Sequence, residues 1–391
     1  MDSDLPPDTN VPPIAAPPPP PIHRPPPVIP LPPTPPPLPP RAPRSGAGLK
    51  IFAVLLVVIL AVSLLVNLQY FVRSFAGNRV KLTGGDSYGP RMDETTVKES
   101  EISTTNKIVM IPVEGVISGE AAQQGGYSIV TLVKEELKRA KENDDVRAVI
   151  LKVDSPGGEV LASDEIAKAI RKFENSCDKP VVVSMGSLAA SGGYYISAPC
   201  DWIVANELTI TGSIGVIMHG LNYRGLLDKI GVRPEVFKSG KYKDMLSPTK
   251  TPDEESPEEK EMIQNMINET FGKFKSVVAD GRRTSFERDH GKMLSPDWQD
   301  YADGRILSGK EAYKLGFVDE VGDFDDAVER AKQLAHIKRA DVVTYQEVFD
   351  LSNLLHIFGE SNAKSVKVEL GVDIPKLHAG YLYFISPTYL Q

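Results

Sequence analysis

The sequence predicts an α/β domain built from repeated βαβ units, preceded by one transmembrane helix near the N-terminus. From residue 107 onward, short runs that are apolar on both faces alternate with amphipathic helical patterns. This alternation is typical of a parallel sheet covered by helices. Residues 51–72 form the one long apolar segment, and at about 1.5 Å per residue they would span roughly 30 Å, one hydrocarbon core.

The segment that precedes the predicted span is rich in proline. Of the 33 prolines, 21 lie in the first 50 residues. A stretch with no apolar periodicity cannot bury a core, so we expect residues 1–48 to be a disordered leader with polyproline II character. Such a leader is compatible with recruitment of SH3- or WW-like grooves, but the pattern favours a plain spacer. Residues 73–106 are polar and are predicted to be a linker.

The apolar segment 51–72 is predicted to be an uncleaved signal anchor. A cleaved signal peptide is disfavoured because a 50-residue leader is unusual and no small-residue cleavage site follows the segment. Three basic residues lie just before the span (residues 41–50) and three just after it (residues 73–81). The flanking charge therefore does not decide the orientation of the span.

Residues 107–335 are predicted to form the α/β domain. We expect its strands at residues 108–111, 148–153, 181–184, 202–205 and 235–237. We expect its helices at residues 128–142, 162–175, 189–197, 310–315 and 324–334, with a charged helical insertion over residues 251–290. Residues 336–391 are predicted to be a C-terminal extension that ends in an apolar, aromatic stretch.

Composition disfavours several kinds of partner. The formal net charge is −8 and no basic stripe is visible, so nucleic acid is not expected as a partner. The six histidines are scattered and no paired-cysteine motif occurs, so we expect no metal and no other cofactor. Cys177 and Cys200 each precede a predicted parallel strand, at the same edge of the sheet. Their placement is compatible with one disulfide in an oxidising compartment and equally with two free thiols.

Three glycine-bearing turns follow predicted strands. In Asp154-Ser-Pro-Gly-Gly158, paired glycines let the backbone approach a ligand and leave an N–H pointing outward. In the second turn, Ser191 and the glycines after it open a predicted helix, where free N–H groups can stabilise an oxyanion. A serine at this place is also a common helix cap. Small residues fill the third segment, 209–217, and a lysine-rich segment, 237–248, follows it.

Four motifs occur in a definite order: Ser155-Pro-Gly-Gly158, Ala189-Ala-Ser-Gly-Gly-Tyr-Tyr195, Thr211-Gly-Ser-Ile-Gly-Val216 and Ser239-Gly-Lys-Tyr-Lys-Asp-Met245. In their order and in the identity of their residues, these motifs resemble those of the signal peptide peptidase A (protease IV) family of serine peptidases. The segment from Gly304 to Asp319 resembles a later block of that family, so the likeness covers about residues 107–335. The resemblance implies the crotonase/caseinolytic-protease-like fold, with one copy of the domain per chain.

The resemblance also implies the roles of individual residues. Ser191 would be the nucleophile, Lys243 the general base, and Ser213 the hydroxyl that holds the lysine. The backbone N–H groups of Gly158 and Gly192 would form the oxyanion hole.

These roles agree with the chemistry of the side chains. A serine hydroxyl is a weak nucleophile until a base within about 3 Å removes its proton. Lysine accepts a proton only as the neutral amine, so it must lie away from carboxylates, and the neighbouring Asp244 must point elsewhere. Lys241 is the other candidate base, but the motif selects Lys243.

Other functions remain open on the sequence alone. His219 follows Ser191 by 28 residues, and related folds of the caseinolytic protease type place a triad histidine at a comparable position, so a Ser-His-Asp peptidase is an alternative. A crotonase-type acyl-CoA enzyme is another, with Glu159 beside Gly158 as its only hint. A non-enzymatic membrane scaffold that uses the proline-rich leader is a third.

The resemblance implies a membrane-anchored endopeptidase that degrades cleaved signal peptides or other apolar, membrane-associated peptides. It implies a single-pass protein of the cell (inner, cytoplasmic) membrane, with a cytoplasmic N-terminus and an extracytoplasmic catalytic domain. Family members assemble into dome-like homo-oligomeric rings in which adjacent chains complete each site. The insertion 251–290 and the apolar tail are each compatible with subunit contacts, and the tail is also compatible with lying over the active-site groove.

Overall fold

The computed structural model describes residues 89–121, 126–347 and 382–385, together with residues 52, 55–60 and 62–64. The chain divides into two units, Met1–Gly85 and Asp86–Gln391. The predicted leader 1–48 lies outside the described residues. The few described residues within the predicted span 51–72 are helical, but none of the described helices is both long and apolar enough to cross a membrane. The transmembrane helix therefore stays a prediction.

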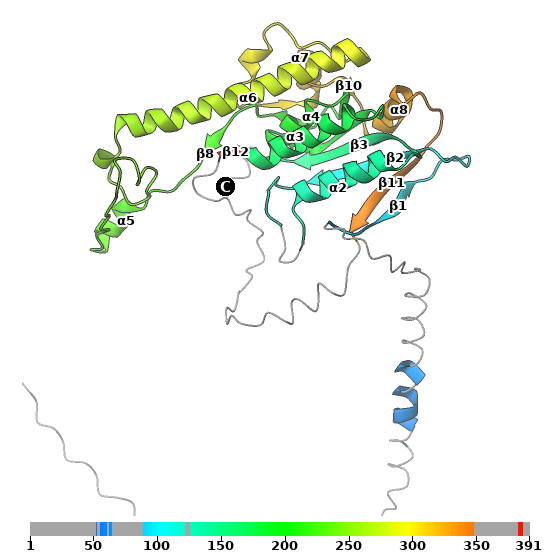
Figure 1. Cartoon of the computed structure of the whole chain (residues 1–391), viewed down its shortest axis with the longest axis horizontal. Coiled ribbons are helices and arrows are strands. Elements are labelled where there is room, and N and C mark those ends of the chain that lie inside the picture. Colours follow the sequence, from blue (N-terminus) through cyan, green and yellow to red (C-terminus); the bar gives the residue numbers. More distant parts are fainter. Residues whose placement is uncertain are drawn as a thin grey trace, which may run out of the picture. The chain divides into compact units, whose positions relative to one another are not determined.

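The second unit is built on a nine-stranded sheet whose centre is parallel (Figure 1). The parallel strands, in spatial order, are β11 (Asp341–Glu347), β2 (Lys107–Glu114), β3 (Val146–Ser155), β5 (Val181–Ala190), β6 (Trp202–Ala205) and β10 (Glu320–Val321). At one edge β1 (Met92–Lys98) pairs antiparallel with β11. The end of β5 also pairs with β7 (Ile210–Gly212), which in turn pairs with β9 (Ile306–Ser308). The predicted α/β class with a parallel sheet is confirmed.

Helices cover both faces of this sheet, which explains why its central strands are apolar throughout. On one face lie α2 (Ile129–Glu142), α3 (Val160–Glu174) and α4 (Gly192–Ser197), which share a core with Val109 and Ile111 of β2. On the other face α8 (Phe324–Leu334) packs against Ile108 of the same strand. Successive residues of β2 thus face opposite layers. The short helix α7 (Gly309–Leu315) follows β9.

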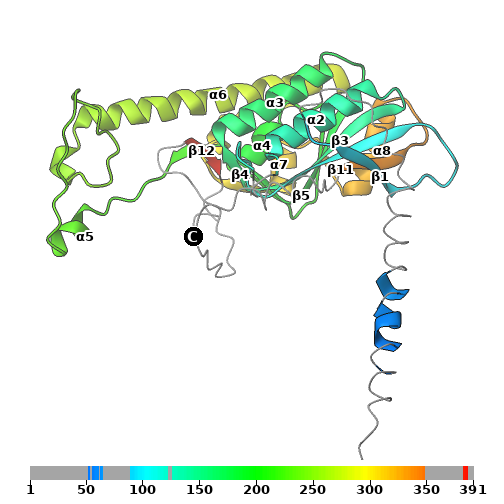
Figure 2. The ribbon, with the colours of Figure 1, turned by 60° about the horizontal axis from the view of Figure 1, so that its bottom comes forward.

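A long helix, α6 (Pro257–Asp289), joins this body to a projecting arm. We use "the arm" for residues 219–250, which include α5 (Arg224–Lys229) and lie beyond the N-terminal end of α6 (Figures 1 and 2). The C-terminal half of α6 is buried against the body. There the fully buried Arg282 pairs with Asp319, with Nη2 2.8 Å from Oδ2.

The domain is wider than the predicted range 107–335. The strand β1 falls in the predicted linker 73–106, and β11 falls in the predicted extension 336–391, yet both belong to the main sheet. In β1 only Met92 is buried, because an edge strand carries polar side chains and leaves no apolar run in the sequence. The predicted insertion 251–290 is confirmed as helical by α6.

Two predicted elements differ from the structure. No strand forms at residues 235–237, where Phe237 is 94% exposed on the arm, so this apolar run is surface rather than core. The predicted helix 189–197 begins only at Gly192, because the residues before Ser191 continue β5 and pair with β7.

The two cysteines are free thiols in the structure. The Cys177 thiol lies 3.3 Å from the carbonyl of Phe173, and the buried Cys200 thiol lies 3.6 Å from that of Ile196. Of the two arrangements that the sequence allowed, the structure has the one without a disulfide.

A buried carboxyl on α2 makes the stability of the domain depend on pH. Glu136 is 4% exposed, and burial raises its pKa from 4.5 to about 8. Between those pH values the Glu136 carboxyl is ionised in the unfolded chain but protonated in the folded chain. The free energy of unfolding therefore falls as pH rises, by at most about 1.4 kcal/mol per pH unit. We expect Glu136→Gln to remove this slope in urea unfolding curves measured from pH 5 to pH 8. Equal slopes in the two proteins would show that Glu136 is ionised when folded.

Candidate active site

Ser191 lies at the junction where β5 ends and α4 begins. Its backbone has φ 54° and ψ −113°, a conformation that L-residues rarely adopt and that clusters at functional sites. The side chain is fully buried and does not cap α4, and its Oγ has no hydrogen-bond partner within the described part of the chain. The alternative that Ser191 is a helix-capping serine therefore fails.

The two predicted oxyanion donors lie directly against each other. Gly158 belongs to β4 (Gly157–Glu159), which follows β3. A β-carbon added to Gly192 would stand 3.0 Å from the backbone nitrogen of Gly158. Only glycine permits this approach, so Gly158 and Gly192 lie together beside Ser191.

The N–H of Gly158 points away from Ile117, on the opposite side of β4. On one side of β4, the N–H of Ile117 donates to the carbonyl of Gly157 at 2.9 Å, and the N–H of Glu159 donates to the carbonyl of Ile117 at 2.8 Å. Neighbouring residues of a strand direct their hydrogen-bonding groups to opposite sides. The N–H of Gly158 therefore faces the other side of β4.

That other side is occupied by a strand from the C-terminal tail. β12 (Leu382–Ile385) lies between β4 and β8 (Ile217–Met218) and pairs antiparallel with both. Phe384 is the register partner of Gly158. Of the two placements that the sequence left open for the apolar tail, residues 382–385 have the one beside the predicted oxyanion donors.

The carbonyl of Phe384 lies next to the predicted oxyanion hole. A β-carbon on Gly157, which has φ +97°, would stand 1.9 Å from the carbonyl oxygen of Phe384 and 2.5 Å from the backbone nitrogen of Gly192. The oxygen is thus close to Gly192 and faces the N–H of Gly158. β12 therefore runs along β4 with the carbonyl of Phe384 beside the two predicted oxyanion donors.

Ser213 is held close to Ser191 by the sheet. It follows β7, whose last residue, Gly212, pairs with Ala190 and accepts a hydrogen bond from the N–H of Ser191 at 2.9 Å. Ser213 is 3% exposed and has φ 49°, and its N–H donates to the carbonyl of Arg305 at 2.7 Å. Its place beside the serine agrees with the role implied by the resemblance.

Lys243 is not brought to Ser191 within one chain. It lies exposed on the arm, while Ser191 Oγ has no partner among the described residues. His219, the alternative base, is also exposed, directly after β8. The structure of one chain thus leaves Ser191 without a base from either candidate.

The surroundings of Lys243 are nevertheless suited to a base. The carboxylate of Asp244 lies 2.8 Å from Lys238 Nζ and 3.2 Å from Lys250 Nζ. The hydrogen bond from Lys238, followed by that from Lys250, lowers the pKa of Asp244. The adjacent carboxylate is thus engaged by other cations, as the proposed role of Lys243 requires. The rival base Lys241 lies over the Tyr242 ring, 4.8 Å from its centroid.

Two residues of this site, Gly157 and Phe384, were not predicted from the sequence. In the sequence, Gly157 is recognisable only as one of two adjacent glycines, and its positive φ is not. Phe384 is recognisable only as part of an aromatic tail. Among the described residues, no three His, Cys, Asp or Glu side chains lie together as a metal-binding group.

A strained serine at the end of a parallel strand, beside two close glycine N–H groups, is the arrangement of a peptidase that acts through serine. Comparison with known proteins identifies the family. Residues 174–338 match the model of Peptidase family S49. The chain belongs to this family and is a serine peptidase.

Similar proteins are found in archaea, bacteria and a plant. The "Putative protease MJ0651" of Methanocaldococcus jannaschii is 36% identical over 321 residues, which cover 81% of this chain and 94% of that protein. The "Putative signal peptide peptidase SppA" of Enterococcus faecium is 39% identical over 273 residues, 68% of this chain and 74% of that protein. "Protease 4" of Haemophilus influenzae is 34% identical over 243 residues, 61% of this chain but 36% of that longer protein.

Gly158→Ala tests the position of the oxyanion hole. The added β-carbon would stand 1.9 Å from the carbonyl of Ile117, so β4 must shift and its N–H must leave the hole. We expect kcat for peptide hydrolysis to fall about 100- to 1,000-fold, as on loss of one oxyanion donor. Gly272→Ala, in open space on α6, is the matched control. An active Gly158→Ala enzyme would place the hole elsewhere.

Proposed function

We propose that this serine peptidase is a membrane-anchored endopeptidase whose catalytic dyad consists of Ser191 of one chain and Lys243 of a neighbouring copy. The observation that carries the proposal is the Ser191 hydroxyl, which is buried beside two glycine N–H groups and has no hydrogen-bond partner among the described residues. A serine nucleophile needs a base at hydrogen-bond distance. The described part of one chain supplies no such base. Lys243 is exposed on the arm, from which it is able to reach the active site of a second copy.

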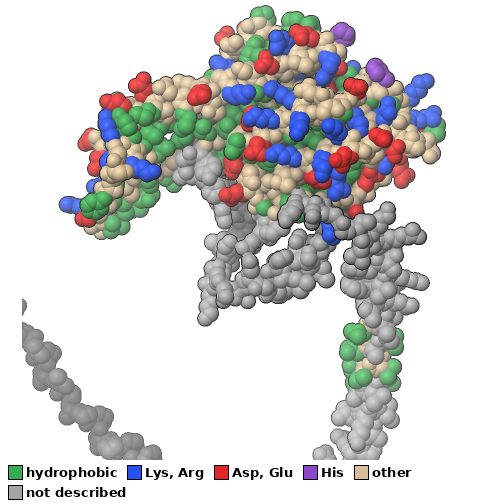
Figure 3. All heavy atoms as spheres, viewed as in Figure 1, with side chains coloured by type: hydrophobic (Ala, Val, Ile, Leu, Met, Phe, Trp, Pro, Cys, Tyr) green, Lys and Arg blue, Asp and Glu red, His purple; other side chains and the backbone are tan. Residues whose placement is uncertain are grey.

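The arm has the surface of a subunit contact. Hydrophobic side chains gather over the arm and the adjoining part of α6 (Figure 3). Several are more than half exposed on the arm: Leu221, Leu226, Ile230, Val236 and Phe237. Apolar patches of this kind mark interaction surfaces. A second copy is the partner that also explains why Lys243 lies on this arm, so the proposal includes a homo-oligomer.

The dyad performs hydrolysis in two halves. The neutral amine of Lys243 takes the proton of Ser191 as its Oγ attacks the peptide carbonyl, and the N–H groups of Gly158 and Gly192 hold the resulting oxyanion. The lysine then returns the proton to the departing amine, and a water molecule releases the acyl group by the same route. Ser213 holds the lysine amine without adding charge.

The substrates are proposed to be cleaved signal peptides or other apolar peptides at the membrane. The apolar segment 51–72 and the relative named as a putative signal peptide peptidase support this proposal. An anchor would keep the peptidase near such peptides and raise their effective concentration. The proposed place is the cell (cytoplasmic) membrane, with the N-terminus cytoplasmic and the catalytic domain outside.

A fluorophosphonate probe on the full-length protein in detergent tests the dyad. We expect one adduct, on Ser191, that is lost in Ser191→Ala and in Lys243→Ala but kept in His219→Ala. Labelling that survives in Lys243→Ala and disappears in His219→Ala would establish the triad instead. Failure to label Ser191 in the intact protein would contradict the proposed chemistry.

A further inference from the structure

A short segment runs along β4 on the side opposite β12. It comprises residues 115–120, and we call it the backing segment. Its Ile117 forms a parallel bridge with Gly158. The N–H of Ile117 donates to the carbonyl of Gly157, and the N–H of Glu159 donates to the carbonyl of Ile117. These two bonds determine the side of β4 to which the N–H of Gly158 points.

The side chain of Ser155 attaches the start of the backing segment. Its hydroxyl donates to the carbonyl of Gly115 at 2.6 Å and accepts from the N–H of Gly157 at 3.1 Å. Ser155 is fully buried, so both bonds are shielded from water. The first residue of the backing segment is thus connected to the turn that leads to Gly158.

The carboxylate of Glu159 attaches the other end of the backing segment. The Ser118 hydroxyl donates to Glu159 Oε1 at 2.9 Å, and the N–H of Gly119 donates to Oε2 at 3.0 Å. The Ser118 oxygen also accepts from the N–H of Glu120, at 3.1 Å. Hydrogen bonds to a carboxylate are roughly twice as strong as those between neutral groups. Both oxygens of Glu159 therefore hold one short stretch of chain against β4.

Glu159 stands at the N-cap position of α3, yet its side chain makes no capping hydrogen bond. An acceptor side chain at this position typically bonds to the first N–H groups of the helix. The Glu159 carboxylate is directed to the backing segment instead. The residue that hinted at an acyl-CoA enzyme thus has a different set of contacts, which concern the backbone of the oxyanion hole.

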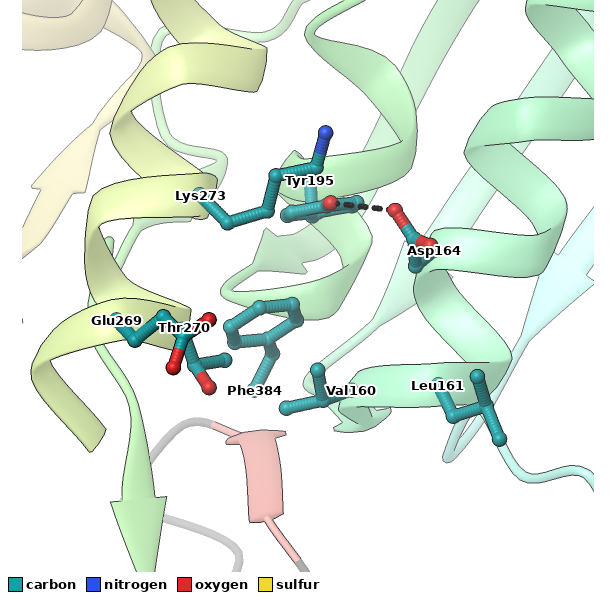
Figure 4. A pocket seen from close by; sticks show the side chains of 8 residues that line it. All are labelled: Val160, Leu161, Asp164, Tyr195, Glu269, Thr270, Lys273 and Phe384. Carbon is teal, nitrogen blue, oxygen red and sulfur yellow. Dashed lines mark hydrogen bonds between the residues drawn. The ribbon is translucent and has the colours of Figure 1, made fainter. Parts of the chain in front are cut away.

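The chain after Glu159 is held by α4, which carries Gly192. The Tyr195 hydroxyl on α4 donates to Asp164 Oδ1 on α3 at 2.8 Å (Figure 4). The buried Ser163 hydroxyl donates to the carbonyl of Glu159 at 2.9 Å, and a β-carbon on Gly192 would stand 2.7 Å from the same hydroxyl oxygen. The start of α3 is therefore fixed relative to Gly192, and the chain before Glu159 depends on the backing segment.

We propose that Glu159 is a positioning residue, whose hold on the backing segment keeps the N–H of Gly158 directed at the oxyanion. Without that hold, the peptide between Gly157 and Gly158 is free to turn. A displacement of about 1 Å at a reacting centre costs about 100-fold in rate. The inference rests on the proposed function of Ser191.

Peptide hydrolysis by the full-length protein in detergent tests this role, with kcat expressed per site titrated to completion with fluorophosphonate. We expect Glu159→Ala to lower kcat about 10- to 100-fold while KM stays within about threefold. Glu159→Gln keeps an acceptor for the N–H of Gly119, and the Ser118 hydroxyl is able to turn and accept from the amide. Its kcat should therefore lie within about threefold of the wild-type value.

Glu165→Ala is the matched control. It removes another carboxylate of α3, one that forms an exposed ion pair with Lys134, and it should leave kcat and KM unchanged. A residue that only supports folding would change the number of titrated sites and not kcat per site, so a destabilised variant still gives an answer.

An unchanged kcat per site in Glu159→Ala overturns the positioning role while leaving the dyad intact. A Glu159→Gln enzyme as slow as Glu159→Ala also overturns it, because the carboxylate would then act in the reaction itself. If fluorophosphonate does not label Ser191 in the wild-type protein and no peptide is cleaved, the proposed function fails and the positioning role fails with it.

Discussion

Replacing Lys243 by alanine is expected to lower kcat/KM for peptide hydrolysis by about 10⁴-fold, close to the effect of Ser191→Ala. Removal of either member of a catalytic dyad costs most of the rate, because the serine is not activated without its base and the base has no nucleophile to activate without the serine. The measurement is hydrolysis of a fluorogenic apolar peptide by the full-length protein in detergent, with fluorophosphonate titration of active sites.

Lys241→Ala is the matched control for that experiment. It removes the same charge from the same arm, two residues away, from a side chain that lies over the Tyr242 ring. We expect it to keep kcat/KM within about threefold, as for a surface substitution. A Lys243→Ala enzyme that retained a tenth of the wild-type rate would show that another group is the base.

Removal of the C-terminal strand is expected to raise kcat/KM for short peptides by about tenfold. β12 pairs with β4 and β8 on both of its sides, so a substrate must displace it before reaching Gly158. The apparent affinity for substrate equals the intrinsic affinity multiplied by the fraction of enzyme whose site is open. If about one tenth of the enzyme is open, removal of β12 raises kcat/KM about tenfold. The measurement compares the full chain with a chain that ends at residue 381.

A substitution and a peptide keep this prediction testable if truncation weakens the fold. Phe384→Asp places a carboxylate between the rings of Tyr195 and Phe274, and it should raise kcat/KM as truncation does. A peptide with the sequence Tyr381-Leu-Tyr-Phe-Ile-Ser386 should inhibit the truncated chain competitively. Unchanged kcat/KM in both variants, with no inhibition by the peptide, would mean that β12 leaves the site in solution.

The central fold was predictable because burial on both faces leaves continuous apolar runs in the sequence. The runs that became β2, β3, β5 and β6 are of this kind. The strand β1 was not predicted because an edge strand is polar. The run at 235–237 was wrongly predicted as a strand because an exposed apolar run has the same local pattern as a buried one. Local pattern does not distinguish a buried apolar run from an exposed one.

The candidate site was predictable where its parts lie on successive strand ends of one sheet. Ser191, Gly158, Gly192 and Ser213 come together for that reason. The pairing of Phe384 with Gly158 was not predictable in register, because it joins segments more than 200 residues apart and depends on tertiary structure. The separation of Lys243 from Ser191 within one chain was not predictable either, because the order of motifs in a sequence does not say which chain supplies each residue to a site.

Complementation between two inactive variants tests the shared dyad most directly. Ser191→Ala and Lys243→Ala chains carrying different tags are co-expressed, and oligomers that carry both tags are isolated. If neighbouring chains share each site, about a quarter of the contacts join an intact Ser191 to an intact Lys243, and the mixed oligomer recovers about a quarter of wild-type activity. A mixed oligomer as inactive as either variant alone would contradict a dyad shared between chains.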